Sequence, residues 1–445
     1  MTGPAAPGAE VTQGRRAAVV VLGDLGRSPR MQYHALALAN EGFSVDLIGY
    51  GGRPADDEVA HHPRVRIHEL PQPWRRRVPR ALWAPVAAAD VVAQAAALAR
   101  LLMILPRPDV LLTQNPPSFP TLAVARAVAR LRGTRWIVDW HNFGADMLAL
   151  RLGPAHPAVR LARALERTLA AAAEGHLCVS AAMRDVLDAR WGIAEACVLR
   201  DRPAKRVGRT PPDQRARLFA RYGIAVDALA GDRPAVIVTS SSWTADEDFS
   251  LLLDAMVVCE ATLARGGAPA PGLFFLMTGD GPQRVQWEQR FASRAFQHVR
   301  TKTVWVDAAD YPRLLGAADL GVSLHRSASG VDLPMKIADM FGAGLPVCAL
   351  DYGPVLSELV RAGENGALFS TGQQLAQQLL STLAGFPGAK RLEALRGGVE
   401  RLAGESWAEG WRREARALLL GTEDVGDRAV GGEVVDQEVA GPSAS

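Results

Sequence analysis

An α/β fold with two doubly wound parallel sheets in tandem is predicted by three features of the sequence. Short apolar runs alternate with segments of helical pattern along most of the chain, which is typical of a series of βα units. A charged stretch containing Pro211 and Pro212 interrupts this series near its middle, as a linker would. With 445 residues, of which 48% are hydrophobic, the chain can form two ordinary domain cores.

These features divide the chain into two Rossmann-like domains that face each other, flanked by polar ends. The last segment mixes Gly, Val and acidic residues without a period, which predicts disorder. We expect a disordered N-terminus at 1–14, a first domain at 15–204, a linker at 205–233, a second domain at 234–385, C-terminal helices at 386–420 that pack back toward the first domain, and a disordered tail at 421–445.

The first domain opens with the buried strand 17–22, and the other elements follow in βα order. Ser28 suits the N-cap of the next helix, Pro29 its first position, and Gly42 its end. Further strands are expected at 43–48, 109–113, 136–139 and 176–179 in the first domain, and at 235–239, 273–277, 303–306, 320–324 and 345–349 in the second. Ligands of such folds bind beyond the carboxyl ends of the strands, so the residues that follow each strand are the candidates for function.

Composition and charge exclude several classes of protein. The net charge of +3 does not indicate a nucleic-acid partner. The four cysteines are far apart and lie in or beside apolar segments, which predicts buried thiols in a reducing compartment rather than disulfides or a metal site. The N-terminal residues lack the apolar h-region of a secretory signal.

The most apolar segment is 81–105, and polar residues such as Asp90 and Arg100 interrupt it. We therefore interpret it as an amphipathic helix rather than a membrane span. The basic residues at 75–77, together with Trp74, would suit an anionic membrane surface. A core helix packed on a sheet explains the same periodicity equally well.

The loop GDLGRS after the first strand is a candidate anion site. Its amides precede the N-terminus of a helix, and Arg27 and Arg30 add charge that suits a diphosphate. A plain βα turn with solvated arginines is the alternative, since the loop lacks the G-x-G-x-x-G spacing of dinucleotide folds. Asp24 is unusual in such a place because a carboxylate repels phosphate.

A second polar cluster, Asp139-Trp140-His141-Asn142, lies at the end of the strand at 136–139. Burying an Asp and a His together is costly without a purpose. His141 is therefore a candidate base, or a donor to a substrate hydroxyl. A structural histidine bonded to a neighbouring carbonyl is the alternative interpretation.

Two turns of the second domain also suit a ligand. The serines at 240–242 offer three hydroxyls and their amides to phosphate oxygens. We interpret the acids at 246–248 as first-turn residues that stabilise the dipole of the following helix, rather than as metal ligands. Gly279 and Gly281 would let a ligand approach the backbone.

The richest candidate stretch is 327–339. Small residues at 329–330 place amides near the N-terminus of a predicted helix, where an anion would bind. Lys336 in the first turn is unfavourable to the helix dipole unless a bound phosphate offsets it. Asp339 suits a ribose diol, and Asp332 suits a sugar hydroxyl.

Long stretches of the chain resemble one family. They are VVVLGDLGRSPRMQYHALALA, VDWHNFG, SSSWTADEDFSLLLDA, TGDGP, DYPRLLGAADLGVSLHRSASGVDLPMKIADMFGAGLPVCA and ENGALF. These motifs are similar to those of the chitobiosyldiphosphodolichol β-mannosyltransferases, over roughly residues 16–415. The resemblance implies a GT-B fold with an acceptor-side first domain and a second domain that binds GDP-mannose. It also implies transfer of mannose to GlcNAc₂-diphosphodolichol at the cytosolic face of the endoplasmic reticulum membrane, with inversion to a β-1,4-linked product.

Inversion by direct displacement needs one base for the acceptor hydroxyl and a stabilised GDP leaving group. Asp24 ranks first as the base and His141 second, and no metal or other cofactor is expected. The acceptor diphosphate is assigned to Gly26, Arg27, Ser28 and Arg30. The donor contacts are assigned to Ser240, Ser241, Ser242, Gly279, Gly281, Trp305, Ser329, Gly330, Asp332, Lys336 and Asp339.

Members of that family commonly begin with a hydrophobic anchor, and none is found before residue 17. Docking on the membrane through 74–105 is therefore expected, with other mannosyltransferases of lipid-linked oligosaccharide assembly as further partners. Two alternatives remain open. One is a retaining GT-B glycosyltransferase that uses another nucleotide-sugar. The other is a non-catalytic subunit that docks a glycosyltransferase complex on the membrane.

Overall fold

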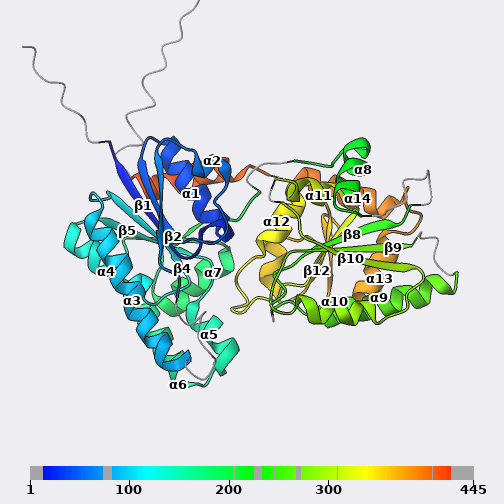
Figure 1. Ribbon diagram of the computed structural model, residues 1–445, viewed down its shortest axis with the longest axis horizontal. Helices are drawn as coiled ribbons and strands as arrows, with labels where there is room; N and C mark the ends of the chain where they lie inside the picture. Colours follow the sequence, from blue (N-terminus) through cyan, green and yellow to red (C-terminus); the bar gives the residue numbers. More distant parts are fainter. Residues whose placement is uncertain are drawn as a thin grey trace, which may run out of the picture.

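The computed structural model describes residues 14–73, 83–203, 207–224, 233–244, 246–266, 272–307, 309–402 and 404–421. Two parallel sheets lie side by side, and helices cover the faces of each (Figure 1). This arrangement confirms the predicted α/β fold with two Rossmann-like domains. Trp74 and the basic residues at 75–77, which belong to the expected docking segment, lie outside the described residues.

The first sheet has seven parallel strands in the order β3-β2-β1-β4-β5-β6-β7. Its strands are β1 (Arg16–Asp24), β2 (Ser44–Tyr50), β3 (Val65–Leu70), β4 (Val110–Asn115), β5 (Arg135–Trp140), β6 (Gly175–Cys178) and β7 (Cys197–Val198). Its helices are α1 (Pro29–Asn40), α2 (Asp57–Ala60), α3 (Trp83–Ile104), α4 (Thr121–Arg132), α5 (Gly144–Leu152), α6 (Pro157–Ala170) and α7 (Ala181–Val186). The strand order reverses between β1 and β4, so this is where a ligand crevice is expected.

The second sheet has six parallel strands in the order β10-β9-β8-β11-β12-β13. Its strands are β8 (Ala235–Ser240), β9 (Leu273–Thr278), β10 (Val299–Val304), β11 (Leu320–Ser323), β12 (Val347–Leu350) and β13 (Gly366–Phe369). Its helices are α8 (Pro212–Arg221), α9 (Phe249–Ala264), α10 (Arg284–Ala292), α11 (Tyr311–Ala317), α12 (Met335–Gly342), α13 (Gly372–Thr382) and α14 (Lys390–Leu402). Here the order reverses between β8 and β11, which places the serine turn at 240–242 beside the crevice.

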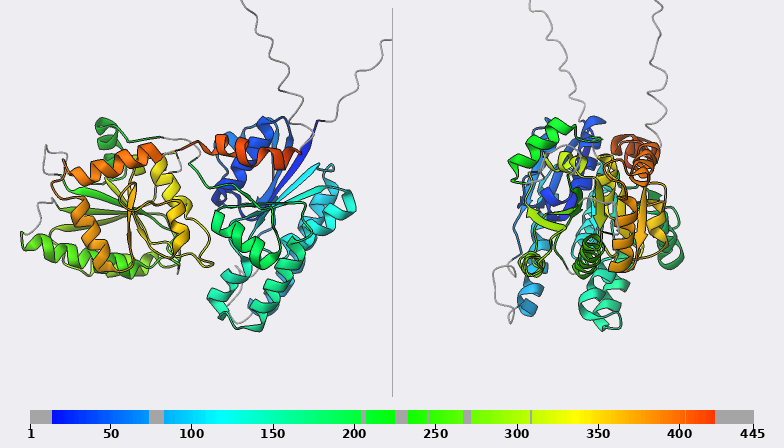
Figure 2. Two further views of the ribbon diagram at one scale, coloured as in Figure 1. Left: turned by 180° about the vertical axis from the view of Figure 1, so that it is seen from behind. Right: turned by 90° about the vertical axis from the view of Figure 1, so that its right-hand side faces the viewer.

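Two short helices connect the end of the chain to the first domain. They are α15 (Trp407–Glu414) and α16 (Arg416–Leu420). Trp407, Trp411 and Leu419 are buried in the same core cluster as the apolar residues of β1 and α1. Figure 2 shows these red helices against the blue first domain when the molecule is seen from behind.

Three expectations about the elements need correction or refinement. The strand predicted at 303–306 is β10, which ends at Val304, so Trp305 lies just beyond it. The strands β3, β7 and β13 were not anticipated, because they are short or lie at sheet edges. In α3, Leu98 and Leu102 are buried in the core whereas Val92 is exposed, so the helix does pack on the sheet with one face.

The structure also provides observations on the predicted state of the cysteines and on the predicted lack of a membrane span. The thiols of Cys178, Cys259 and Cys348 are buried and that of Cys197 is half-buried, and all four are free. Within the described ranges, no helix combines the length and the apolar character needed to cross a bilayer.

Candidate active site

His141 follows directly on β5, at the carboxyl edge of the first sheet. Its Nε2 lies 2.9 Å from Asp139 Oδ2, and 22% of its side chain is exposed. No group among the described residues bonds to its other ring nitrogen, Nδ1. A carboxylate can only accept, so a neutral His141 carries its hydrogen on Nε2 and leaves Nδ1 free to take a proton. This is the geometry of a base held by an orienting carboxylate.

Asp139 is itself buried and holds three cationic or imidazole partners. Arg30 donates to it through Nε and Nη2, at 2.8 Å each. Arg30 also donates from Nη1 to Asp201 Oδ1 at 2.8 Å and to the Leu199 carbonyl at 2.7 Å. Burial raises the pKa of Asp139, but Arg30 and His141 outweigh it and hold this pKa well below its usual range. Asp139 is therefore an anion that keeps His141 in one orientation.

Arg30 cannot serve as the diphosphate ligand that the sequence suggested. It is 1% exposed, and its guanidinium is committed to Asp139 and Asp201. Buried arginine forms bidentate pairs of this kind because its planar fork matches a carboxylate. The prediction for this residue is therefore corrected from a ligand contact to a buried structural cation.

A third partner of Asp139 reaches the C-terminal helix. His34 Nε2 lies 3.2 Å from Asp139 Oδ2, and Trp411 Nε1 donates to His34 Nδ1 at 3.1 Å. Burial lowers the pKa of His34, so the ring is neutral with its hydrogen on Nε2. Sequence reasoning missed this histidine. The i, i+4 spacing of Arg30 and His34, which puts both on one face of α1, was the available signal.

The GDLGRSP loop is closed on itself. Asp24 Oδ1 accepts hydrogen bonds from the amides of Gly26 at 3.1 Å and Arg53 at 3.2 Å. The Ser28 hydroxyl donates back to the Asp24 carbonyl, at 3.0 Å. Arg27 is the one group of the four assigned to a diphosphate whose side chain is well exposed, at 55%. Asp24 therefore occupies the Gly26 amide and the Ser28 hydroxyl, whereas Arg27, whose Nε lies 3.7 Å from Asp24 Oδ2, keeps an exposed side chain that an anion could reach.

In the second domain, Glu247 gathers the residues that the sequence assigned to a phosphate. Its Oε2 accepts from the amides of Ser242 and Trp243, both at 2.9 Å, and from Ser241 Oγ at 2.5 Å. Lys336 Nζ lies 2.6 Å from Glu247 Oε1 and donates to Ser242 Oγ at 3.1 Å. The chain's own carboxylate thus sits where a phosphate oxygen was expected.

The three neighbouring acids have three separate roles. Only Asp248 fulfils the predicted one, as the N-cap of α9 that accepts from the Ser250 amide. Asp246 instead faces His325, and Glu247 holds the serine turn. Sequence reasoning missed Glu247 because its contact with Lys336 joins residues that are far apart in the chain, although Ser241, Ser242 and Trp243 lie only four to six residues before it. Among the residues that the structure describes, no group of three or more His, Cys, Asp or Glu side chains is placed to hold a metal ion.

Packing between loops explains two of the assigned glycines. A Cβ at Gly279 would overlap the carbonyl oxygen of Ser241, and one at Gly281 would overlap that of Ser242. Their role is therefore to let the loops after β8 and β9 touch, rather than to admit a ligand. Ser240 belongs to the same turn, and its hydroxyl accepts from Tyr311 at 2.9 Å.

The loop after β11 is held together by Asp332. This carboxylate is buried and accepts from His325 Nε2 at 3.1 Å, from Ser327 Oγ, and from Ser329 Oγ at 3.3 Å. The Gly330 amide donates to Ser327 Oγ at 2.8 Å. In this conformation the Asp332 carboxylate and the Gly330 amide are both bonded within the loop, so a ligand would have to displace these contacts, and both assignments stay predictions.

The His325 network makes stability depend on pH. Burial lowers the pKa of His325, but its contacts with Asp246 and Asp332 raise it more, to about 9. The charged ring therefore stabilises the fold fully below about pH 6.5, the unfolded value, and this contribution is lost as the pH rises through about 9. Urea unfolding should show a fall in the free energy of unfolding on the order of 2 kcal/mol between these pH values. The variant His325→Gln should show a smaller fall, and an equal fall in both proteins would contradict the assignment.

Asp339 on α12 and Trp305 after β10 both face the first domain. Burial raises the pKa of Asp339 to about 7, and Asp201 of the first domain adds to the shift. No hydrogen-bond partner of its carboxyl occurs among the described residues, which leaves it available to a ligand hydroxyl. The Trp305 ring is 44% exposed, and the Arg53 guanidinium lies 4.2 Å from its centroid.

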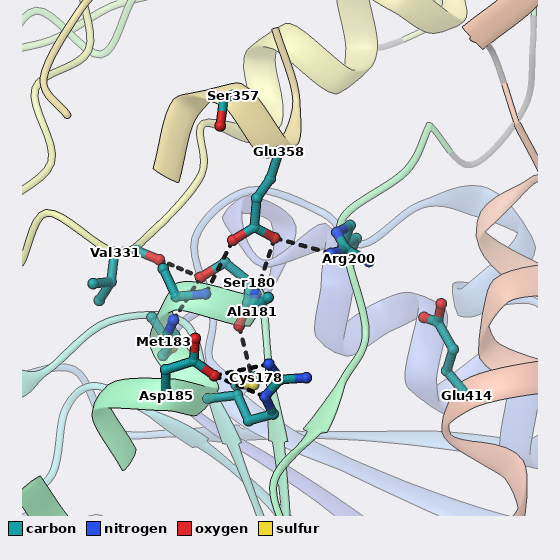
Figure 3. A network of polar contacts seen from close by, with 12 residues as sticks. Cys178, Ser180, Ala181, Met183, Asp185, Arg200, Val331, Ser357, Glu358 and Glu414 are labelled. Carbon is teal, nitrogen blue, oxygen red and sulfur yellow. Dashed lines mark hydrogen bonds and ion pairs between the residues drawn. The ribbon is translucent and has the colours of Figure 1, made fainter. Parts of the chain in front are cut away.

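A set of polar contacts connects the two domains beside the loop that follows β11. The Glu358 carboxylate accepts from the amides of Ala181 and Ala182 at the start of α7, at 3.0 Å each, and from Arg200 at 3.0 Å. Ser180 Oγ donates to the Val331 carbonyl, next to Asp332 (Figure 3). The first domain therefore contacts the second within the loop between β11 and α12, one residue before Asp332.

Two family descriptions match the chain. "Glycosyl transferase 4-like domain" covers residues 26–202, and "Glycosyl transferases group 1" covers residues 233–384. Among solved structures, sucrose-phosphate synthase from Thermosynechococcus elongatus has a TM-score of 0.66 at 17% identity, covering 92% of this chain and 100% of that one. HepE from Anabaena, in complex with UDP, has a TM-score of 0.60 at 17% identity, covering 91% and 99%. These structural likenesses establish the GT-B fold.

Curated relatives are more similar in sequence. The chain is 39% identical to the chitobiosyldiphosphodolichol β-mannosyltransferase of Mus musculus, over 93% of this chain and 90% of that protein. The Homo sapiens protein of the same name is also 39% identical, over 92% and 93%. "UDP-glycosyltransferase TURAN" of Arabidopsis thaliana is 40% identical, over 91% and 97%.

Proposed function

Because this chain belongs to the chitobiosyldiphosphodolichol β-mannosyltransferase family, we propose that it transfers mannose from GDP-mannose to GlcNAc₂-diphosphodolichol. The observation that carries the proposal is the pair formed by His141 and the buried Asp139, on the domain that faces Lys336 and Asp339. It supplies a base on the acceptor side and a cation on the donor side, as a displacement reaction requires.

We propose His141 as the base in place of Asp24. In the step, the acceptor hydroxyl oxygen attacks the anomeric carbon of mannose, and the bond from that carbon to the GDP oxygen breaks. The hydroxyl proton passes to Nδ1 of His141, and Asp139 stabilises the imidazolium that forms. Asp24 is a poorer candidate because the amides of Gly26 and Arg53 already occupy its carboxylate.

For the leaving group we propose Lys336 and the N-terminal end of α12. A donor diphosphate would compete with Glu247 for the Lys336 ammonium and for the amides of the serine turn. The negative charge that develops on GDP is then neutralised by this cation and by the helix dipole. We propose that these groups suffice without a metal, and that Asp339 takes the ribose and Trp305 the guanine.

The donor and the stereochemistry are testable together. Purified full-length protein should release GDP from GDP-mannose only when a synthetic GlcNAc₂-diphosphate lipid is present, and should do so in EDTA. Nuclear magnetic resonance of the product should show a β-linked mannose. An α-linked product, or turnover with a UDP-sugar as the name of the Arabidopsis relative suggests, would favour a retaining or differently specific enzyme. Absence of turnover with every donor would favour the non-catalytic alternative.

The lipid part of the acceptor indicates where in the cell the protein would act. A dolichol-linked substrate stays in a bilayer, so we propose that the protein acts at the cytosolic face of the endoplasmic reticulum membrane, alongside other mannosyltransferases of lipid-linked oligosaccharide assembly. Nucleic acid has no part in this reaction.

A further inference from the structure

We propose that the hairpin formed by α5 and α6, residues 144–170, is a docking surface for an anionic lipid bilayer. Together these two helices form the docking hairpin. The inference rests on the proposed function only for its biological purpose, since the surface itself can be tested without turnover. Figure 1 shows α5 and α6 projecting from the first domain, away from the sheet.

The docking hairpin exposes an unusual density of large apolar side chains. They are Met147 at 45%, Leu150 at 64%, Leu152 at 45%, Leu161 at 62% and Leu165 at 41% exposure. Single exposed leucines are common on soluble proteins, but five large exposed apolar side chains within nineteen residues of one hairpin are a concentration that indicates a contact surface. On α6 the i, i+4 spacing of Leu161 and Leu165 places both on one face.

The charge of the docking hairpin favours an anionic partner. Arg163 pairs with Asp146 at 2.7 Å. Arg151, Arg160 and Arg167 have no acidic partner within the part of the chain that the structure describes. Exposed leucines among unpaired arginines match the chemistry of an interfacial helix, which buries its apolar side chains in a bilayer and attracts anionic headgroups. A second copy of this chain would bring the same cations into opposition.

A buried glutamate connects the docking hairpin rigidly to the candidate base. Glu166 on α6 accepts from the amides of Gly144 at 2.8 Å and Ala145 at 3.1 Å, which begin α5 three residues after His141. It also accepts from Asn115 at 2.8 Å, at the end of β4, and from Ser118 at 2.6 Å, in the loop that follows. Helix α6 is about 21 Å long, from 1.5 Å per residue. A bilayer at the hairpin would therefore lie within about one such length of His141, which suits an acceptor whose lipid stays in the membrane.

Vesicle flotation of the full chain tests the surface. Wild-type protein should float with phosphatidylcholine vesicles that contain about 30% phosphatidylserine and float poorly with phosphatidylcholine alone. The double variant Leu161→Glu, Leu165→Glu should bind anionic vesicles at least about tenfold more weakly, because two apolar anchors are lost. Arg151→Glu, Arg160→Glu, Arg167→Glu should abolish the preference for anionic vesicles.

A matched control and two readouts keep the test decisive. Leu131→Glu changes a leucine that is 75% exposed on α4 and should float like the wild type. Thermal unfolding of each variant checks that it is folded. The proposal would be overturned if the Leu161→Glu, Leu165→Glu variant floated like the wild type, or if Leu131→Glu lost as much binding. It would also be overturned if the wild type ignored vesicles and dimerised through these leucines. The Leu161→Glu, Leu165→Glu variant should still turn over a detergent-soluble acceptor. If the wild type does not turn over that acceptor, the result counts against the proposed function and leaves the docking surface untouched.

Discussion

His141→Ala should lower turnover of GDP-mannose with a GlcNAc₂-diphosphate lipid by about a hundredfold to ten-thousandfold, the range that a lost general base usually costs. The reason is the free Nδ1 atom, which the Asp139 contact at 2.9 Å from Nε2 keeps unprotonated in the neutral ring. The measurement is the initial rate of GDP release at saturating donor and acceptor. Affinity for the donor should change little, because the donor residues lie on the other domain.

Two variants separate this role from its alternatives. Asp24→Asn should keep most of the activity, because an amide oxygen can still accept from the Gly26 and Arg53 amides. His61→Ala removes an exposed histidine of the same domain and should behave as the wild type. A severe loss in Asp24→Asn together with an active His141→Ala would restore Asp24 as the base.

Arg30→Met should destabilise the protein by about 3–5 kcal/mol, the usual cost of removing one partner from a buried ion pair. The change leaves the buried carboxylate of Asp139 without its bidentate partner, and it leaves Asp201 without the same guanidinium. Methionine keeps much of the apolar volume, so the loss reflects charge rather than a cavity. Urea unfolding, followed by far-UV circular dichroism, measures the change for the first domain.

The comparison with a neighbouring arginine decides between the two roles considered for Arg30. Arg27→Met removes a side chain that is 55% exposed and should alter stability by no more than about 0.5 kcal/mol. Under the proposed function, Arg27→Met should instead raise the KM for the diphosphate acceptor. A stable Arg30→Met protein with a raised acceptor KM would contradict the buried-cation role.

Part of the candidate site follows from the order of the sequence. In a parallel βα series, the residues after each strand reach the same edge of the sheet, so the pattern of strands and turns is enough to select His141, Ser242 and Lys336. The sequence could also have singled out Arg30 and His34, because their spacing places them on one face of α1. The pairing of Glu247 with Lys336 could not be predicted, since the two residues are 89 positions apart, one in the loop before α9 and the other in the first turn of α12.

The sequence by itself determined the two α/β domains and the strand ends where polar residues gather. Those follow from the period of apolar residues and from turn chemistry, which are local properties. The helix α8, which was expected in a linker at 205–233, instead packs in the core of the second domain through Leu218 and Phe219. Only the tertiary structure decided which polar groups remain available to a ligand. Arg30 is buried against Asp139, and Lys336 is paired with Glu247, and each partner lies far away in the sequence. Buried polar groups need hydrogen-bond partners, and these pairs form because folding brings together side chains from distant segments, which no local pattern of residues shows.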